Sequence, residues 1–562
     1  MAEGQEVNII PQRASDQTRI FANQRMTTNN SSSVTNAEDV FVSMTRPEEI
    51  EGDRQSKAID RNEKHLCTDH LVGDLKGRTI SGAFITIASQ GTQFLLNLAS
   101  IMVMARLLTP RDFGLYAMVT TITGFLFMFQ DAGLSTATVQ REEITHAQVS
   151  NLFWVNVGVG GITSLIVAAL APVVAWFYHE PRLVGITLVL SSSFLLASLA
   201  VQHIALLNRQ MRFAVIAVIY IVAALTGYLT GAGMALLGYG YWALVGASVT
   251  QGAVQLVLAW LISGWRPGLP SRNTQTWHML TFGANITAGS LIYSLARGTD
   301  NLLIGRFFGA AAVGLYSRAS ILLLRPLQQF TMPINAVLIP ALSRLQAQPD
   351  RYRRTFLRVY EALAMISFLC TGLLLALARP VTLVVLGPKW EQAAPIFAGF
   401  SIAALCIPLG TASTWLFQTQ GRGKDWLFFS LLGSCITFGS FVAGLPFGPA
   451  GVAISFSLCG LFIGVPALYY FAGREGPVTT ADLWSAIFRY LPLWMVVCGV
   501  TWLVQLLLVS SAPLLQLVVC APVGLLAGAI LIYLVPSMRR VAFSLVDILR
   551  ELKSRTGFPY AK

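Results

Sequence analysis

Three arginines, Arg297, Arg318 and Arg325, fall in segments that are otherwise apolar enough to cross a membrane. A guanidinium group is planar, always charged and matches the oxygens of a phosphate group in a bidentate way. An arginine at the centre of a membrane helix costs about 2.5–3.5 kcal/mol on insertion scales. Because Arg318 and Arg325 are seven residues apart, they share one helix face. We predict that the three arginines line a watery cavity and bind an anionic, phosphate-bearing substrate; the alternative is that each pairs with Asp300 or caps a helix near the interface.

Side-chain amides accompany these arginines. Gln90, Gln93 and Asn97 are spaced by three and four residues, so they lie on one face of a helix. Amides of this kind are suited to hydrogen bonds with sugar hydroxyls. The candidate polar lining of the cavity comprises Gln90, Gln93, Asn97, Asn285 and Gln329.

Two carboxylates in or near the apolar segments, Asp131 and Asp300, are candidates for coupling transport to a proton or cation. Asp131 comes just before Gly133 at the end of a predicted span, so solvation at the membrane interface is its alternative role. Asp300 has the alternative of an ion pair with one of the arginines.

Signatures of metal, nucleotide and hydrolytic sites are absent from the sequence. No Cys-x-x-Cys pair, His-Glu-x-x-His motif or Walker loop occurs, and no Ser/His/Asp constellation is visible. We therefore predict no metal site and no cofactor, and a transporter in place of an enzyme.

Composition identifies the solvent for which the chain is built. Hydrophobic residues make up 54% of the 562 residues and charged residues 12%, whereas a soluble domain averages about 25% charged residues. This excludes a disordered protein and an ordinary cytosolic enzyme, and it indicates an integral membrane protein. The net charge of +12 does not indicate nucleic acid, because the basic residues lie mostly between long apolar runs, as cytoplasmic loop anchors do.

The apolar runs predict an all-α polytopic membrane protein with about 14 transmembrane helices. Most lysines and arginines from residue 76 onward fall on one side if both termini are cytoplasmic. The predicted divisions are a polar, mostly disordered cytoplasmic tail (1–78), a six-helix lobe (79–263), a second six-helix lobe (278–471), two additional helices (486–535) and a basic cytoplasmic tail (537–562). The last segment is either an amphipathic stretch on anionic membrane lipids or a solvated tail.

An internal repeat relates the two predicted lobes. Residues 105–119 (ARLLTPRDFGLYAMV) align with residues 305–319 (GRFFGAAAVGLYSRA) at a constant offset of 200 residues. Six predicted spans separate the equivalent positions, and because that number is even, the two halves have the same orientation. We therefore expect two parallel six-helix repeats about an axis along the membrane normal, an arrangement that transporters use.

The repeat blocks resemble the polysaccharide transport family, the repeat-unit flippases of O-antigen and exopolysaccharide synthesis. This family belongs to the multidrug/oligosaccharidyl-lipid/polysaccharide exporter superfamily. The similarity extends over about residues 79–535, and the long N-terminal tail departs from the usual family pattern. The stretches that carry it are 105–119, 131–140 (DAGLSTATVQ), 300–319 (DNLLIGRFFGAAAVGLYSRA) and the proline-bearing 325–345.

The resemblance implies a flippase for undecaprenyl-diphosphate-linked oligosaccharide repeat units in the bacterial inner membrane, working by alternating access around a cationic cavity. Its implied partners are the polyprenyl-diphosphate-linked oligosaccharide and membrane lipids, with a polysaccharide polymerase and a chain-length regulator as candidates. The alternatives are a multidrug or metabolite exporter, or a peptidoglycan-precursor flippase, of the same fold. From another class, the alternative is a membrane polysaccharide polymerase or ligase, but the long loop such an enzyme needs is absent.

Overall fold

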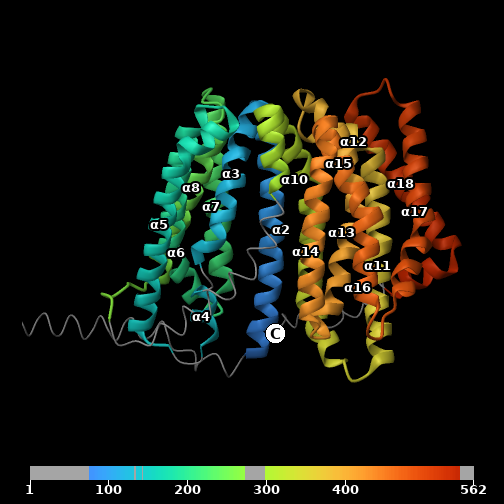
Figure 1. The fold of residues 1–562 in the computed structure, drawn as a ribbon, viewed down its shortest axis with the longest axis horizontal. Helices are drawn as coiled ribbons and strands as arrows, with labels where there is room; N and C mark the ends of the chain where they lie inside the picture. Colours follow the sequence, from blue (N-terminus) through green and yellow to red (C-terminus); the bar gives the residue numbers. More distant parts are fainter. Residues whose placement is uncertain (1–74, 132–133, 142–143, 272–297, 545–562) are drawn as a thin grey trace, which may run out of the picture. The chain divides into compact units, whose positions relative to one another are not determined.

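The computed structural model describes residues 75–131, 134–141, 144–271 and 298–544 (Figure 1). Within these ranges the chain forms helices and no β-strand, which confirms the predicted all-α class. The predicted N-terminal tail up to residue 74, the end of the basic tail from residue 545, Asn285 and Arg297 lie outside the described residues.

The N-terminal helix group, as we call α2 to α8, runs up and down between the two ends of the molecule (Figure 1). Its elements are α2 (Leu75–Leu107), α3 (Pro110–Asp131), α4 (Leu134–Gln140), α5 (His146–Tyr178), α6 (Arg182–Arg209), α7 (Phe213–Leu236) and α8 (Trp242–Ser263).

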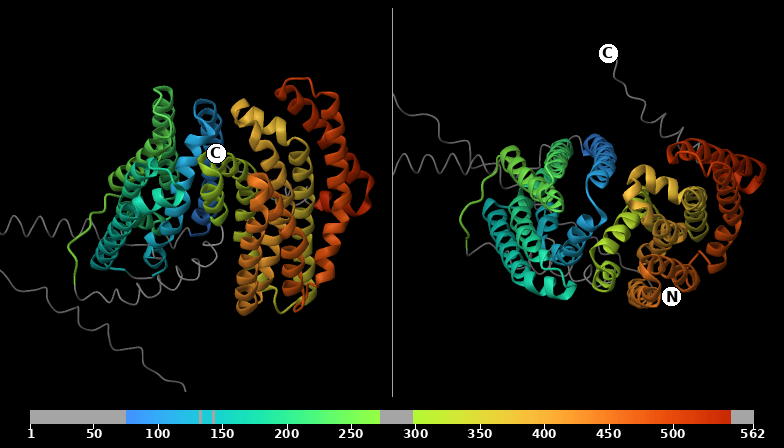
Figure 2. Two further views of the ribbon diagram at one scale, coloured as in Figure 1. Left: turned by 45° about the horizontal axis from the view of Figure 1, so that its top comes forward. Right: turned by 90° about the horizontal axis from the view of Figure 1, so that it is seen from above.

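The C-terminal helix group, α10 to α18, lies beside the first group (Figure 2). Its α-helices are α10 (Thr299–Arg344), α11 (Pro349–Ala376), α12 (Ala378–Val385), α13 (Ala394–Thr419), α14 (Gly423–Gly444), α15 (Gly448–Cys459), α16 (Val465–Gly473), α17 (Thr480–Leu507) and α18 (Pro513–Leu534). Short 3-10 turns at η2 (Pro388–Ala393) and η3 (Leu445–Phe447) and a π-helical turn at η4 (Gly460–Gly464) connect them.

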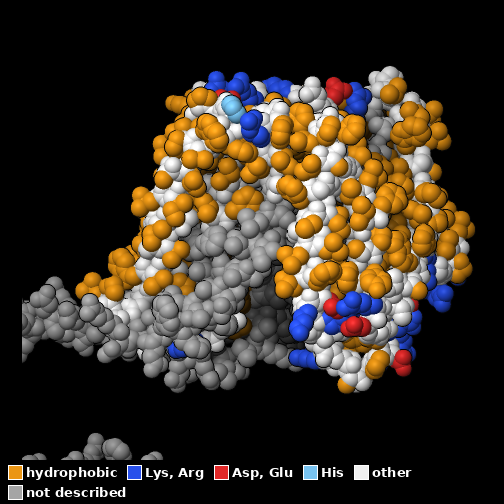
Figure 3. Space-filling view, viewed as in Figure 1, with side chains coloured by type: hydrophobic (Ala, Val, Ile, Leu, Met, Phe, Trp, Pro, Cys, Tyr) orange, Lys and Arg blue, Asp and Glu red, His pale blue; other side chains and the backbone are white. Residues whose placement is uncertain are grey.

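Eleven helical segments of the described residues are long and apolar enough to cross a membrane, against about fourteen predicted for the whole chain. One of them, Gly423–Gly473, has 51 residues. It is broken at Gly448, whose φ of 76° lies in the region that glycine tolerates, and the chain reverses there. Large apolar side chains cover the flanks of the helices, while charged ones gather toward the two ends (Figure 3). This is the surface of a protein that faces lipid around its middle.

The apolar pattern of the sequence predicts spans over residues 278–298 and 312–340 with a loop between them, but that loop is mostly helical. The helical run from Thr299 to Arg344 contains one break, at Gly309, where φ is 79° and ψ is −176°. Only glycine adopts this combination readily. Asp300 and Arg306 interrupt the apolar pattern, and hydropathy therefore begins the predicted span of residues 312–340 too late.

The repeat seen in the sequence reappears as a reciprocal contact between α3 and α10. A Cβ atom on Gly114 would lie 1.6 Å from the backbone oxygen of Ala310, and one on Gly314 would lie 1.8 Å from that of Pro110. The two contacts are equivalent: Gly314 is 200 positions after Gly114, and Ala310, which Gly114 approaches, is 200 positions after Pro110, which Gly314 approaches. Such an exchange of equivalent contacts is what a local two-fold axis produces.

A second pair of equivalent turns lies at the opposite end of the two groups. Arg212, before α7, has φ −84° and ψ 53°, and Arg422, before α14, has φ −85° and ψ 54°. The preceding residues, Met211 and Gly421, both have positive φ, of 53° and 69°. The two turns therefore share one backbone conformation although their sequences share little beyond a glutamine and an arginine.

Among the described residues, the buried core is continuous across both helix groups only at the end where α2 turns into α3, which we call the α2–α3 end. A single cluster there contains Phe113 and Met118 of the first group with Tyr316 and Trp390 of the second. Toward the opposite end, the buried clusters belong to one group each. The two groups are thus joined at the α2–α3 end and have separate buried cores toward the opposite end.

Polar contacts reinforce this junction. Trp390, fully buried, donates from Nε1 to the carbonyl oxygen of Ala105 at 2.8 Å and packs edge-on against Phe113. Arg106 donates from Nη2 to the carbonyl oxygen of Val384 at 2.9 Å. These bonds run from α2 to the α12–η2 segment and add direction to an apolar contact.

Candidate functional site

Arg318 lies on α10 where that helix faces α3. Its guanidinium carbon is 4.6 Å from the centre of the Phe113 ring, a cation–π contact. Its Nε atom is buried and has no hydrogen-bond partner among the described residues. A desolvated guanidinium nitrogen without an acceptor is costly, so Arg318 stays a candidate for binding an anion.

Arg325 lies two helical turns further along the same face of α10 and is exposed. It lines a cavity of about 440 Å³, together with Asp300. Neither Arg318 nor Arg325 forms an ion pair with any residue that the structure describes, Asp300 included. The alternative in which Asp300 neutralises Arg318 or Arg325 is therefore not the arrangement seen, while Arg297 lies outside the described residues.

The N-terminal helix group presents hydroxyl and amide groups to these arginines. Asn97 of α2 donates from Nδ2 to the hydroxyl oxygen of Tyr228 on α7 at 3.2 Å. The Tyr116 hydroxyl on α3 and the Ser248 hydroxyl on α8 are 2.5 Å apart. Tyr228 lies within electrostatic reach of Arg325, and Tyr116 within reach of Arg318.

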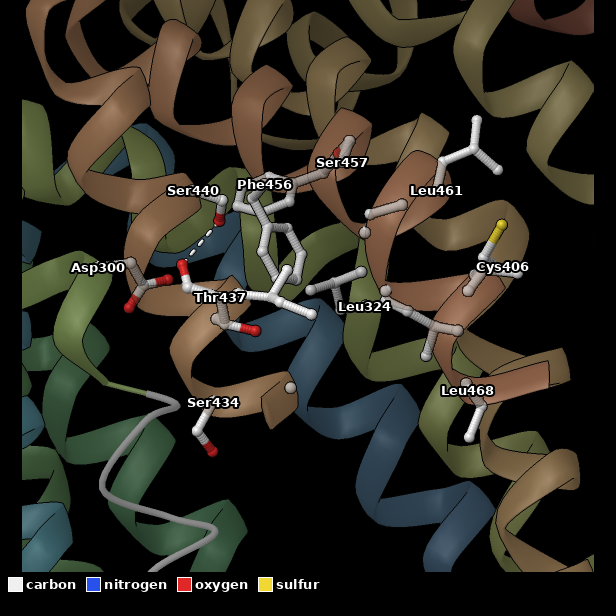
Figure 4. Close-up of a pocket in the computed structure, with 18 of the residues that line it drawn as sticks. Asp300, Leu324, Cys406, Ser434, Thr437, Ser440, Phe456, Ser457, Leu461 and Leu468 are labelled. Carbon is white, nitrogen blue, oxygen red and sulfur yellow. Dashed lines mark hydrogen bonds between the residues drawn. The ribbon is translucent and has the colours of Figure 1, made fainter. Parts of the chain in front are cut away.

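The cavity of about 440 Å³ lies inside the C-terminal helix group, between α10, α13, α14 and the α15–α16 segment (Figure 4). One wall is a row of hydroxyl side chains on α14, at Ser430, Ser434, Thr437 and Ser440. Their spacing of three and four residues places them on one face. The opposite walls are apolar and aromatic, with Phe400, Phe429, Phe441 and Phe456 among the lining residues.

A second cavity, of about 620 Å³, lies in the N-terminal helix group between α4, α6 and α7. Ser135, Asn208, Tyr220 and Gln255 supply its polar groups, and no arginine or lysine lines it. It is separate from the groups that surround Arg318 and Arg325.

The structure brings together only part of the predicted site. Arg318 and Arg325 lie on one face of α10, and among the described residues Asn97 is linked to Arg325 only through Tyr228, to which it donates a hydrogen bond. Gln93 bonds to Ser89 one turn away on α2, and Gln90 is half-buried on the same helix. For Asp131, the last residue of α3, and for Gln329 of α10, the backbone is described but the side chain is not.

The sequence analysis did not identify Tyr116, Tyr228 and Ser248 of the N-terminal helix group. Tyr116 belongs to the repeated Gly-Leu-Tyr block, which we used only to align the halves. Tyr228 and Ser248 lie on α7 and α8, in apolar runs where a single hydroxyl residue carries no pattern. The hydroxyl row on α14 could have been found from its spacing.

A comparison with protein families decides the relationship of the chain. The model of a family described as polysaccharide biosynthesis protein matches residues 103–395, which is more than half of the chain. The chain belongs to this family. The matched region contains both Gly-Leu-Tyr blocks, Arg318 and Arg325.

Curated relatives are similar over most of the membrane region. The chain is 25% identical to the lipopolysaccharide biosynthesis protein WzxC of Escherichia coli, covering 68% of this chain and 79% of that protein. It is 26% identical to the teichuronic acid biosynthesis protein TuaB of Bacillus subtilis (63% and 72%). It is 24% identical to the succinoglycan biosynthesis transport protein ExoT of Rhizobium meliloti (64% and 73%).

Solved structures share the fold at low identity. The lipid II flippase MurJ in an inward closed conformation superimposes with a TM-score of 0.63 at 14% identity, covering 80% of this chain and 98% of that one. An inward-facing multidrug transporter of the MATE family gives a TM-score of 0.54 at 14% identity, covering 72% and 99%. These likenesses show that the chain shares the fold of these proteins, and they show nothing about its substrate.

Proposed function

We propose that the protein is a flippase that moves polyprenyl-diphosphate-linked oligosaccharide repeat units across the bacterial inner membrane for surface polysaccharide synthesis. One observation carries this proposal: Arg318 and Arg325 face hydroxyl groups of the other helix group without any described carboxylate to neutralise them. The family and the names of the relatives, which include polysaccharide and transport proteins, support the same direction.

The chemistry of the site suits a diphosphate. Two guanidinium groups offer planar, charge-assisted donors that match phosphate oxygens. A cationic drug would be repelled by the same groups, and this argues against the multidrug exporter. The hydroxyl row of the 440 Å³ cavity, facing aromatic walls, offers acceptors and flat apolar surfaces of the kind that sugars contact.

The proposed mechanism is alternating access between two six-helix lobes, residues 79–263 and 278–471, with 486–535 as added helices. The continuous core at the α2–α3 end, with Trp390 bonded to Ala105, supports a conformation closed at that end. We assign that end to the periplasmic side and both termini to the cytoplasm. The substrate would then enter from the cytoplasmic leaflet, and its release would require the α2–α3 end to separate.

We further propose Asp300 as the residue through which an ion couples to transport. It lines the same cavity as Arg325, so its occupancy by a proton or cation would alter the electrostatic potential at the diphosphate. Asp131 is the second candidate. A polysaccharide polymerase and a chain-length regulator are the proposed downstream partners, because a flipped repeat unit must next be polymerised.

The experiment uses a strain that lacks the gene. Complementation with the Arg318→Ala or Arg325→Ala variant should leave the cells without surface polymer and with single lipid-linked units on the cytoplasmic face. Arg306→Ala is the matched control, because Arg306 lies on the same helix and is exposed outside the cavity. Normal polymer with both cavity variants would contradict the assignment. Units that reach the periplasmic face but stay unpolymerised would indicate a polymerase.

A further inference from the structure

The hydrogen bond between Asn97 and Tyr228 has a defined direction. The Asn97 amide donates and the Tyr228 oxygen accepts. A phenol that accepts in this way still holds its own proton, and accepting a bond makes that proton a better donor. The Tyr228 O–H group has no acceptor in any hydrogen bond that the described residues form with it.

The second pair repeats this arrangement on neighbouring helices. The Tyr116 and Ser248 hydroxyls are bonded to each other at 2.5 Å. One of the two protons forms that bond, and Ser248 or Tyr116 keeps the other for a further acceptor. Tyr116, Ser248 and Tyr228 are half-buried, and Asn97 is exposed.

Each tyrosine has an arginine of the other helix group as its electrostatic neighbour. Tyr228 interacts with Arg325, and Tyr116 with Arg318. The Arg318 Nε atom is buried and has no acceptor among the described residues. Two arginines of one helix group thus each lie within electrostatic reach of a tyrosine of the other group, and no described ion pair includes either arginine.

We propose that Tyr228 and Tyr116 are ligand-binding residues that complete two half-sites, Arg325 with Tyr228 and Arg318 with Tyr116, so that one diphosphate group binds both helix groups at once. Asn97 is a positioning residue that orients the Tyr228 hydroxyl. This inference rests on the proposed function and deepens it. It means that the N-terminal helix group also binds the diphosphate. Binding by the arginines alone would involve only α10.

The two half-sites give a specificity. A monophosphate can satisfy one arginine–tyrosine pair, whereas a diphosphate can satisfy both. The site should therefore prefer undecaprenyl diphosphate over undecaprenyl monophosphate, and the preference should depend on both tyrosines. Inorganic pyrophosphate should compete with the lipid, because the recognised chemistry is the diphosphate and not the tail.

The test measures binding of undecaprenyl diphosphate to the full-length protein in lipid nanodiscs. Tyr228→Phe removes one oxygen atom and should weaken binding about tenfold, since a hydrogen bond to a charged group is lost. Tyr220→Phe is the matched control, because it removes a hydroxyl from the same helix, α7, at the separate 620 Å³ cavity. It should leave binding unchanged.

The role of Asn97 is tested with a double-mutant cycle. Asn97→Ala should weaken binding in the parent protein but should have no further effect when Tyr228 is already phenylalanine. A merely structural role for Asn97 would instead give additive losses. If Tyr228→Phe fails to fold, Tyr116→Phe tests the second half-site by the same measurement.

The outcomes separate this inference from the proposed function. Loss of binding in Arg325→Ala with full binding in both Tyr→Phe variants would overturn the tyrosine half-sites and leave the flippase standing. Equal affinity of the parent protein for monophosphate and diphosphate would also overturn them. A parent protein that binds neither undecaprenyl diphosphate nor pyrophosphate would refute the proposed function itself.

Discussion

Replacing Gly114 with alanine would test whether the close approach of α3 and α10 keeps the α2–α3 end closed. The added Cβ atom would lie 1.6 Å from the backbone oxygen of Ala310, whereas real Cβ atoms essentially never approach closer than 3.0 Å. The two helices must therefore separate by about 1.4 Å at this point, because a backbone carbonyl cannot rotate aside as the end of a flexible side chain can.

The expected free-energy change follows from the overpacking of this contact, which costs about 1–3 kcal/mol. The gain in helix propensity from glycine to alanine, about 1 kcal/mol, is common to the closed and the separated conformation and cancels between them. The closed conformation should therefore lose about 1–3 kcal/mol, which corresponds to about a 5- to 150-fold shift toward separated helices.

The assay is thiol labelling from outside the cell. Ser320, which lines the 440 Å³ cavity, is replaced by cysteine in a background without the native cysteines. A membrane-impermeant reagent should label Ser320→Cys faster when Gly114→Ala is present. Gly124→Ala is the control, since Gly124 lies on the same helix and a Cβ atom there meets nothing within 4 Å.

Unchanged labelling and unchanged thermal stability in Gly114→Ala would refute the reasoning, because a 1.6 Å contact cannot be accommodated without movement. Equal effects from Gly114→Ala and Gly124→Ala would show that helix propensity, and not the contact with α10, is responsible. Gly314→Ala should reproduce the Gly114→Ala result, since its Cβ atom would meet the Pro110 oxygen at 1.8 Å.

Three further predictions concern stability, each checked by thermal unfolding of the purified protein. Trp390→Phe keeps the apolar contact but leaves the buried Ala105 carbonyl without its donor, so we expect a loss of about 1–3 kcal/mol; an unchanged midpoint would contradict this. Met211→Gly should stabilise by about 1 kcal/mol, because Met211 has a φ of 53°. Arg422→Lys should destabilise by about 1.5–3 kcal/mol, because Arg422 bonds at once to Asp425 and to the carbonyls that end α16, and a lysine has no planar fork; equal midpoints would show that a point charge is sufficient.

The helical class could be predicted because it depends on local apolar runs, and the repeat could be predicted because its residues match at a constant offset. The apolar runs determine where helices form in lipid, and the Gly-Leu-Tyr blocks align at one offset. The break at Gly309 was missed for a physical reason. A glycine in a membrane helix carries no polarity signal, and hydropathy placed the span boundaries at residues 298 and 312 instead.

Of the candidate site, the arginines on α10 could be predicted from the sequence, but the tyrosines of the N-terminal helix group could not. Arg318 and Arg325 were identified because a charged side chain in a membrane helix costs free energy, and a residue with that cost is a candidate for function. A tyrosine carries no such cost, since its ring suits lipid and only its hydroxyl requires a partner. Tyr228 becomes significant only when α2 brings Asn97 to it and α10 brings Arg325, and those contacts depend on tertiary packing.

The seal at the α2–α3 end is built without charge pairs. Its polar bonds run from Trp390 and Arg106 to backbone carbonyls, and no ion pair joins α2–α8 to α10–α18 among the residues that the structure describes. The ion pairs present there, such as Arg111 with Glu180 and Arg379 with Glu391, stay within one group.

A seal of this kind is largely insensitive to ionic strength, because salt screens exposed charges far more than it affects packing or bonds to carbonyls. The medium outside a bacterium ranges from dilute fresh water to concentrated saline. A contact that relied on exposed salt bridges would be weaker in saline, where ions screen the charges, and stronger in fresh water. In the proposed alternating-access mechanism, this chain would keep the same resting conformation in both media, and its opening would depend on the occupant of the cavity.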